Sequence, residues 1–364
     1  MTTIYELSTP ALLLDVDVLE RNLRRMAQRA DTLGVSLRPH IKTHKCVEIG
    51  ELQRALGARG ITVATLPEAR AFAEHGFDDI TWAFPVILAR VDEALALAER
   101  ATLRLVVDSA DAVAALERAG RPLHVWLKVD CGYHRAGVDP RSPLALELSR
   151  ALHESSTLAF DGILSHSGHA YYGPTQTESA RAAAEERDVM VEFATALRSN
   201  GIPVEGISVG STPSMNAVDH LEGVTEARPG NYAFYDYTQV LLGACTLRDC
   251  AVTVLASVVS SQPAAHHCVT DAGALALSKD IGREDAPSPT MGEIYGDYGA
   301  GALLADTRLA SLSQEHGVVS RPLPVGSRVR ILPNHSCLTA ACFDEYHVVQ
   351  GEDVVDRWPI RRER

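Results

Sequence analysis

The first two thirds of the chain alternate short apolar runs with longer amphipathic segments. Short continuous apolar runs are typical of buried strands, and apolar positions three or four apart are typical of helices. The pattern predicts eight strands, at residues 35–40, 61–65, 80–84, 103–107, 123–130, 159–166, 206–210 and 227–234. It predicts helices between them, at residues 48–56, 67–75, 91–100 and 177–199. In the last helix the expected buried face is formed by Ala180, Ala183, Ala184, Met190, Val191, Ala194 and Leu197.

Strands that alternate with helices favour a parallel sheet with helical crossovers, and eight of them favour a closed (β/α)8 TIM-type barrel over an open sheet. After residue 242 helical periodicity is weak. Strands are expected there at residues 247–260, 267–270, 328–332 and 346–349, separated by connectors such as 282–301. We therefore expect an α/β chain with a barrel at 12–242 and a mostly β C-terminal domain at 243–364, joined by residues 1–11.

Composition narrows the function. The net charge of −13 disfavours nucleic acid as a partner, and no run approaches the ~20 apolar residues that span a membrane. The seven cysteines include no C-x-x-C pair, and residues 1–10 lack the features of a secretory signal, so reduced thiols and a cytoplasmic location are expected. Of 34 basic residues four are lysines, at positions 42, 45, 128 and 279.

Polar residues gather where the proposed strands end, at residues 38–45, 130–135, 165–172, 210–214 and 229–232. Each segment alone could be turn chemistry. In a (β/α)8 barrel, however, these ends share the face that carries active sites. The small residues after the last two strands could form a phosphate nest, made of Gly210, Ser211, Thr212, Gly230 and Asn231. A lysine after the first strand could bond the other end of such a ligand, an arrangement that suits pyridoxal phosphate or a sugar phosphate aldolase.

Several motifs resemble a known family. They are the segment 9–15, the segment 39–45, Asp130-x-Gly-x-x-Arg135-x-Gly137, and the segments 229–232, 315–317 and 333–337. Together they resemble the fold type III pyridoxal phosphate enzymes, in the branch of D-serine dehydratase and D-threonine aldolase. The resemblance spans nearly the whole chain and implies an alanine-racemase-like barrel, a β domain and a homodimer.

The resemblance also implies roles for single residues. Lys42 would form the covalent link to the cofactor, with Lys45 as its rival, and Arg135 would contact the phenolic oxygen. The phosphate would be held by Ser211, Thr212, Gly230 and Asn231. His169 and Tyr171 would pack near the ring or its nitrogen, His169 as a catalytic residue, although His166 and Tyr172 are equally near in the sequence.

A metal pair is the remaining feature. On an extended strand, His335 and Cys337 would face the same side. Imidazole and thiolate suit Zn²⁺, whereas carboxylate ligands would favour Mn²⁺ or Mg²⁺. Taken alone, Cys337 would more often be a small buried hydrophobe. The resemblance matches the pair to the zinc ligands of D-serine dehydratase, and aldolases of the branch carry aspartate in place of the cysteine.

The implied activity is that of a pyridoxal phosphate- and metal-dependent lyase. Lys42 would remove the Cα proton of a D-β-hydroxy amino acid, the ring would accept electrons, and the metal would assist loss of hydroxide, giving a 2-oxo acid and ammonia. D-serine and D-3-hydroxyaspartate are the expected substrate types. The alternative is retro-aldol cleavage to glycine and an aldehyde. A racemase or a non-catalytic carrier of pyridoxal phosphate fits less well, because a racemase needs no metal and a carrier needs no β domain.

Overall fold

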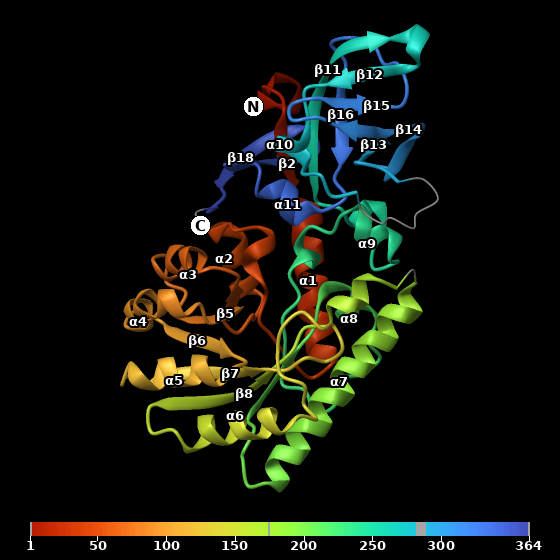
Figure 1. Ribbon diagram of the computed structural model, residues 1–364. Helices are drawn as coiled ribbons and strands as arrows, with labels where there is room; N and C mark the ends of the chain where they lie inside the picture. The colour runs from red at the N-terminus through yellow and green to blue at the C-terminus, as the bar shows by residue number, and fades with distance from the viewer. Residues whose placement is uncertain (1, 174, 282–288, 363–364) are drawn as a thin grey trace. The chain divides into compact units, whose positions relative to one another are not determined.

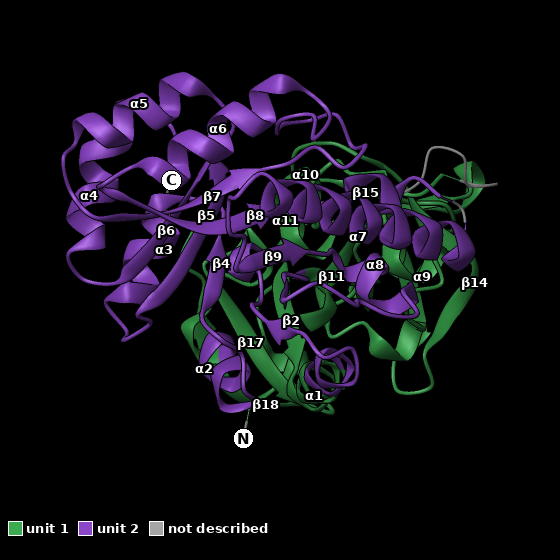
Figure 2. Cartoon of the chain, turned by 90° about the horizontal axis from the view of Figure 1, so that it is seen from below, with its two compact units in different colours: residues 1–25, 43–48, 231–362 green, residues 26–42, 49–230, 363–364 purple. Residues whose placement is uncertain are grey.

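The computed structural model describes residues 2–173, 175–281 and 289–362. Within it the chain divides into two compact units, coloured separately in Figure 2. The β unit comprises residues 2–25, 43–48 and 231–362, and the barrel unit comprises residues 26–42 and 49–230. Residues 12–25 and 231–242, which the sequence analysis assigned to the barrel, group with the β unit. Part of the predicted connector 282–301, at 282–288, lies outside the described residues, and the rest was wrongly predicted as a connector, because it contains a strand at Glu293–Asp297.

The barrel unit contains eight parallel strands, which confirms the predicted α/β architecture. They are β3 (Ser36–Leu37), β4 (Ile61–Val63), β5 (Asp79–Pro85), β6 (Thr102–Val107), β7 (Leu123–Lys128), β8 (Leu158–Leu164), β9 (Gly206–Val209) and β10 (Glu226–Ala227). Their order is β3-β10-β9-β8-β7-β6-β5-β4. A parallel bridge between His40 and Thr62, supported by the 2.8 Å bond from Thr62 N to Pro39 O, joins β3 to β4. The strand order therefore closes on itself.

Helices connect these strands and pack on the sheet (Figure 1). They are α2 (Val47–Ala55), α3 (Leu66–Ala73), α4 (Val91–Ala98), α5 (Ala110–Arg118), α6 (Pro143–Glu154), α7 (Gln176–Ser199) and α8 (Thr212–Ala217). Helix α1 (Val16–Thr32) precedes β3, and its residues up to Arg25 group with the β unit. Short 3₁₀ turns are η2 (Ile41–Thr43), η3 (Leu88–Arg90) and η4 (Gly168–Tyr171). Pro67 lies in the first turn of α3, as predicted. No helix among the described residues is long and apolar enough to cross a membrane.

Close packing inside the barrel explains two glycines. Trp126 of β7 is 4% exposed and packs with Val106 and Leu164. A Cβ on Gly206 would lie 2.3 Å from the Trp126 ring, and one on Gly162 would lie 2.0 Å from the carbonyl oxygen of Gly206. Gly206 therefore leaves room for the indole, and Gly162 allows the backbones of β8 and β9 to approach each other closely.

Helix α7 begins with a capping box in which Thr175 and Glu178 exchange hydrogen bonds with each other's backbone amides. Its buried face includes the expected Ala183, Met190, Ala194 and Leu197. The rest of that face differs from the expectation: Ala180, Ala184 and Val191 are only half-buried, and Ser179, Ala182, Glu186 and Phe193 are buried instead. A buried glutamate on this face is invisible to a hydrophobic pattern.

The β unit contains a sheet in the order β1-β18-β17-β2-β11-β12-β15-β14-β13-β16, with β16 also paired to β11. The strands are β1 (Thr2–Thr3), β2 (Ala11–Asp15), β11 (Val252–Gln262), β12 (His267–Thr270), β13 (Glu293–Asp297), β14 (Ala302–Leu312), β15 (Gly317–Val319), β16 (Arg328–Leu332), β17 (Glu345–Gln350) and β18 (Asp353–Pro359). Its helices and 3₁₀ turns are α9 (Tyr237–Leu241), α10 (Ala274–Leu277), α11 (Ser336–Ala340), η1 (Ile4–Glu6), η5 (Asn231–Ala233), η6 (Leu247–Asp249) and η7 (Pro263–Ala265). The second pairing of β16 closes six strands into a ring.

Three predicted strands were too long. The first barrel strand, expected at 35–40, comprises only Ser36–Leu37, because Pro39 cannot donate to the ladder and η2 begins at Ile41. The eighth barrel strand, expected at 227–234, ends at Ala227, because Pro229 cannot donate to the ladder and residues Asn231–Ala233 form η5. The strand expected at 247–260 begins at Val252, because Thr246 and Asp249 form a capping box around η6. The other predicted strands are confirmed in place, with shifts at their ends.

Candidate functional site

Lys42 lies in η2, shortly after strand β3. It follows His40, whose bridge to Thr62 closes the strand order. Its side chain is exposed, and its positive charge acts on His166 at the end of β8. Lys45 belongs to the β unit, has a φ of 49°, and accepts a 2.7 Å hydrogen bond at its carbonyl oxygen from Arg361 N. Of these two lysines, Lys42 is therefore the one that belongs to the barrel unit and whose charge acts on His166.

His166 lies among positive charges. Burial is the largest of the effects that lower the pKa of His166 well below its ordinary value. The imidazole is therefore neutral at pH 7. Four cations act in the same direction, namely Lys128, Lys42, Arg135 and Arg228. The barrel unit thus gathers positive charge around one uncharged imidazole.

Two members of this cationic cluster are buried. Lys128 ends β7 and is 7% exposed, and burial followed by the charge of Arg228 lowers the pKa of Lys128 to about 7. Arg228 directly follows β10 and is 5% exposed, and burial lowers its pKa as well, against the raising effect of Glu226 and Glu186. Burying cations without full compensation is costly, so an anion would be stabilised here.

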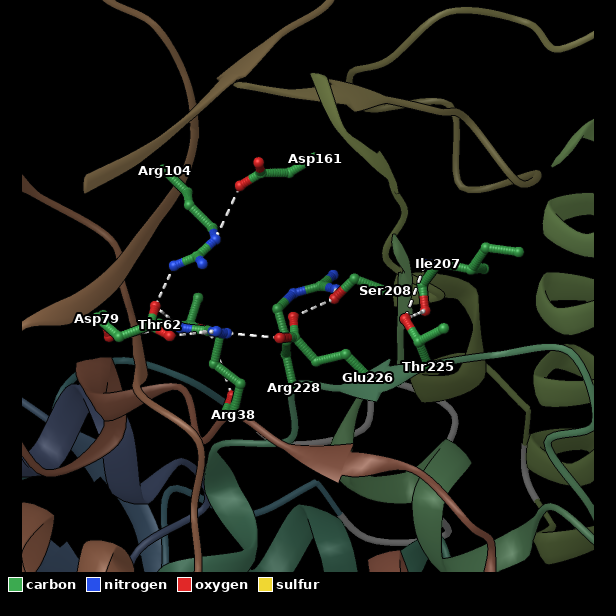
Figure 3. A network of polar contacts seen from close by, with 10 residues as sticks. All are labelled: Arg38, Thr62, Asp79, Arg104, Asp161, Ile207, Ser208, Thr225, Glu226 and Arg228. Carbon is green, nitrogen blue, oxygen red and sulfur yellow. Dashed lines mark hydrogen bonds and ion pairs between the residues drawn. The ribbon is translucent and has the colours of Figure 1, made fainter. Parts of the chain in front are cut away.

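The guanidinium of Arg228 belongs to a polar network drawn in Figure 3. Arg228 donates to Ser208 Oγ, and Ser208 Oγ donates to Glu226 at 2.5 Å. Glu226 also accepts a 2.6 Å bond from Arg38 Nε. The network continues through further ion pairs, which link Arg38 to Asp79, Asp79 to Arg104 and Arg104 to Asp161.

The turn predicted to bind phosphate lies between β9 and α8. Gly210 has a φ of +100°, and Ser211 is the N-cap of α8. The Gly210 amide donates to Glu186 Oε2 at 3.1 Å, and the Ser211 amide donates to Ser214 Oγ at 2.7 Å. Both amides are therefore already bonded within the protein. Thr212 opens the helix, and Gly230 follows Pro229, whose carbonyl oxygen accepts from His40 N at 2.9 Å.

Aromatic side chains surround the His166 and His169 segment. The Tyr133 ring lies edge-on to His166 with the ring centroids 5.8 Å apart, and 6.0 Å from the Tyr172 ring. Arg135 lies over the Tyr133 ring at 4.8 Å. Both ring nitrogens of His169 are buried without a hydrogen-bond partner in the part of the chain that the structure describes. His169 and Tyr171 lie together in η4, and His166 packs against Tyr133. Both His166 and His169 therefore remain candidates to contact a ligand.

The predicted metal pair lies in the β unit, but not on an extended strand. His335 is the N-cap residue of α11 and Cys337 lies in its first turn. The helix starts here because Asp236 Oδ2 accepts bonds from Ser336 N at 3.0 Å and Ser336 Oγ at 3.2 Å. The expectation that the two residues share one side of a strand was therefore wrong. Their side chains nevertheless interact with each other.

Neighbouring groups orient both members of the pair. His335 Nδ1 lies 2.8 Å from Asp280 Oδ2, and Cys337 Sγ lies 3.2 Å from Thr43 Oγ1. Burial opposes the charged form of His335, but hydrogen bonds to Asp280 and Cys337 outweigh it and raise its pKa to about 11. Burial likewise opposes the thiolate of Cys337, yet the hydrogen bond to His335 lowers the pKa of the thiol.

This chemistry suits a metal ion. An imidazole and a thiol of lowered pKa that interact with each other are two donors that a borderline cation could bind together. Asp280 binds Nδ1, the arrangement by which carboxylates orient metal-binding histidines, and leaves Nε2 for the metal. No cluster of three or more His, Cys, Asp or Glu arranged for a metal occurs within residues 2–173, 175–281 and 289–362.

Asn231 belongs with this metal pair rather than with the barrel unit. Its Nδ2 donates to Asp236 Oδ2 at 2.7 Å and to Ser336 Oγ at 2.9 Å, and lies 3.6 Å from Cys337 Sγ. Its Oδ1 is buried without a hydrogen-bond partner in the described chain. A phosphate role for Asn231 would therefore use its backbone amide, because Oδ1 can only accept hydrogen bonds.

The sequence analysis missed several residues of these clusters. Arg228 precedes the Pro229-Gly230 pair that was noticed, and Lys128 was one of four conspicuous lysines, so both carried a signal. Glu186, Asp236 and Asp280 carried none, because single acidic residues in a chain with 47 of them do not stand out.

The comparisons with known proteins cover the whole chain. The alanine racemase N-terminal domain family matches residues 14–238, and the serine dehydratase domain family matches residues 251–349. D-threo-3-hydroxyaspartate dehydratase from Delftia sp. strain HT23 is 38% identical over 98% of this chain and 98% of its own. D-serine dehydratase from Dictyostelium discoideum is 35% identical over 97% of this chain and 96% of its own. D-threonine aldolase from Arthrobacter sp. is 32% identical over 98% and 93%.

Solved structures agree with this relationship. The structure of the Delftia dehydratase superposes with a TM-score of 0.93 at 37% identity, covering 99% of each chain. The same enzyme has been solved as a cysteine-to-alanine variant in a metal-free form and as a histidine-to-alanine variant. The two substituted positions of that enzyme lie two residues apart.

Proposed function

The chain belongs to the alanine-racemase-like enzymes that carry a C-terminal serine dehydratase domain, and from this premise we propose that it is a pyridoxal phosphate- and metal-dependent dehydratase of a D-β-hydroxy amino acid. Its relatives include D-threo-3-hydroxyaspartate dehydratase and D-serine dehydratases, with D-threonine aldolase and 3-hydroxy-D-aspartate aldolases in the same family. The observation that carries the choice of dehydration is the His335–Cys337 pair, because the aldolase branch is expected to have aspartate in place of the cysteine.

The barrel unit suits an anionic cofactor. Lys128 and Arg228 are buried cations whose pKa values are lowered, so a phosphorylated ligand would offset charge that the protein leaves uncompensated. Pyridoxal phosphate, when bound, supplies an electron sink for a carbanion at Cα. In the proposal Lys42 holds it covalently, and Arg135 contacts its phenolic oxygen. The phosphate would be held by Ser211, Thr212, Gly230 and Asn231, and the ring by His169 and Tyr171 or by His166 and Tyr172.

The proton steps fall to the chain's own residues. Lys42 accepts the proton from Cα once the substrate has displaced it. In the proposal His169 holds or returns a proton; its ring nitrogens make no hydrogen bond among the described residues, and its Nε2 lies 4.0 Å from Glu185 Oε2. His166 stays uncharged at pH 7, so it can pack against a ligand without adding a fifth positive charge to the cluster.

The metal proposal assigns Nε2 of His335 and Sγ of Cys337 as ligands. Zn²⁺ is the preferred ion because imidazole and thiolate are its common donors, with Mn²⁺ or Mg²⁺ as alternatives. A metal ion held there supplies Lewis acidity that makes a hydroxyl a better leaving group. The paired histidine and cysteine substitutions in the Delftia enzyme, one of them in a metal-free form, support this assignment. A homodimer and a cytoplasmic location are further parts of the proposal.

A product analysis tests the reaction. The purified enzyme, loaded with pyridoxal phosphate and Zn²⁺, is incubated separately with D-serine, D-threonine and D-threo-3-hydroxyaspartate. Dehydration of D-threonine gives 2-oxobutyrate and ammonia, whereas retro-aldol cleavage gives glycine and acetaldehyde. Glycine as the main product would overturn the proposal in favour of the aldolase. The L-enantiomers serve as controls and should not react.

A further inference from the structure

Glu186 is a buried carboxylate with no role in the function proposed above. It lies in the middle of α7 and is 1% exposed. Burying an ionised carboxylate costs several kcal/mol unless hydrogen bonds and opposite charges compensate it. A side chain retained at such a position calls for a physical explanation.

Its two oxygens bridge the ends of neighbouring barrel strands. Oε1 accepts a 2.7 Å bond from Ser165 Oγ, which follows β8, and Oε2 accepts a 3.1 Å bond from the Gly210 amide, which follows β9. Gly210 opens the turn proposed for the phosphate. One carboxylate from the outer helix therefore ties that turn to the adjacent strand end.

Ser165 extends the bridge to Arg228. The carbonyl oxygen of Ser165 accepts a hydrogen bond from one terminal nitrogen of Arg228, and the other terminal nitrogen donates to Ser208 Oγ. The guanidinium is thus held between two serines, each hydrogen-bonded to a buried glutamate, Glu186 on one side and Glu226 on the other. Figure 3 shows the Ser208–Glu226 half of this arrangement.

The charges around Glu186 support the same role as its hydrogen bonds. The negative charge of Glu186 acts on both Lys128 and Arg228, the two buried members of the cationic cluster. Glu226 is shared with Arg38 through a 2.6 Å ion pair, so its charge is divided between two guanidinium groups. Within the described residues, the hydrogen bonds to the Glu186 carboxylate come from the uncharged Ser165 hydroxyl and Gly210 amide, which leaves its charge to act on the cluster through space.

We propose that Glu186 is a positioning residue for the cofactor: it locks the Gly210 turn to the strand end that orients Arg228, and it balances the charge of the cations that face the ligand. The proposal rests on the function proposed above, because that function places the phosphate at the Gly210 turn. Ligand binding at this turn would then depend on a side chain that touches neither ligand nor solvent.

The test compares Glu186→Ala, Glu186→Gln and the matched control Glu192→Gln, which makes the same charge change at an exposed position of α7. The dissociation constant for pyridoxal phosphate is measured by absorbance titration of the cofactor-free protein, and the absorbance of the loaded protein is followed against pH. Glu186→Ala should bind at least about tenfold more weakly, equivalent to about 1.4 kcal/mol. Glu192→Gln should match the wild type in both measurements.

Glu186→Gln separates hydrogen bonding from charge. Its carbonyl can accept from the Gly210 amide while its NH₂ donates to Ser165 Oγ, so the affinity should stay within about threefold of the wild type. Loss of the negative charge should nevertheless move the midpoint of the absorbance change to lower pH. The reason is that the protonated, positively charged form of the titrating group loses a nearby negative charge that stabilises it.

Each outcome decides something. Wild-type affinity in Glu186→Ala would overturn the bridging role, and a wild-type pH midpoint in Glu186→Gln would overturn the charge-balancing role. If Glu186→Ala does not fold, Ser165→Ala removes only the bond to Oε1 and should weaken binding by about threefold; unchanged affinity there would also overturn the bridge. Failure of the wild-type protein itself to bind pyridoxal phosphate at Lys42 would instead refute the proposed function.

Discussion

Lys128 gives the cofactor-free protein a dependence of stability on pH whose sign can be worked out. In the folded chain, burial and then the charge of Arg228 lower the pKa of Lys128 from 10.5 to about 7. In the unfolded chain the amine keeps its ordinary value of about 10.4. Between these values the unfolded state binds a proton that the folded state does not, so the free energy of unfolding rises with pH from about 7 to about 10. Below pH 7 the penalty is constant.

The magnitude follows from the interval. At about 1.4 kcal/mol per pH unit, the interval from 10.5 to about 7 corresponds to roughly 5 kcal/mol as an upper limit. Lys128→Met keeps an unbranched chain in the same space and removes the charge. We therefore expect it to stabilise the cofactor-free protein at pH 7 by up to that amount, with the advantage shrinking toward pH 10.

Urea denaturation of cofactor-free wild type and Lys128→Met at pH 7, 8 and 9 measures this effect. The difference between the two proteins cancels the other groups that titrate in this range. Lys279→Met, at an exposed lysine, is the matched control and should follow the wild type. Parallel curves for wild type and Lys128→Met across the three pH values would show that the buried amine is not the source of the dependence.

Three further predictions concern the cofactor and the metal. Lys42→Ala should abolish both the visible absorbance of bound pyridoxal phosphate and the covalent attachment of the cofactor that reduction with borohydride makes permanent. Lys45→Ala should retain both. Attachment that persists in Lys42→Ala would contradict the assignment. Chelation should abolish turnover but leave the cofactor bound, because Lys42 lies in the barrel unit and His335 and Cys337 lie in the β unit; release of the cofactor along with the metal would count against it. Asp280→Asn should weaken metal binding about 10–100-fold, measured by competition with a chelating dye, because it removes the carboxylate that orients His335; unchanged affinity would leave the carboxylate without this role.

The barrel was predictable because its strands are short apolar runs between helical segments. What the pattern could not supply was where a strand stops for a tertiary reason. The eighth strand loses its last residues at Pro229, and Cys337 lies in a helical turn rather than on a strand because Asp236, about 100 residues earlier in the chain, accepts a hydrogen bond from the first amide of α11. A hydrogen-bond acceptor supplied from so far away leaves no local signal.

The candidate site, like the fold, was predictable from the sequence only in part. Lys42, His335 and Cys337 were found because lysine is rare in this chain and because the histidine and cysteine are two apart in a recognisable motif. Glu186 was missed because hydrophobic periodicity treats a charged residue on a helix as solvent-facing. Its burial depends on partners from two other strand ends, which a one-dimensional pattern does not bring together.

Strand β2 lies between β11 and β17 in the sheet, and this pairing determines when β2 can join the sheet during synthesis of the protein. The apolar segment Ala11–Asp15 leaves the ribosome early, yet its first strand partner begins at Val252, roughly 240 residues later. At translation rates of about 5–20 residues per second, that segment waits roughly 10–50 s before it can pair. All eight strands of the barrel unit are synthesised during this interval, since β10 ends at Ala227. The nascent chain therefore carries an unpaired, leucine-rich strand for most of its time on the ribosome, and this strand is where we expect a chaperone to bind it.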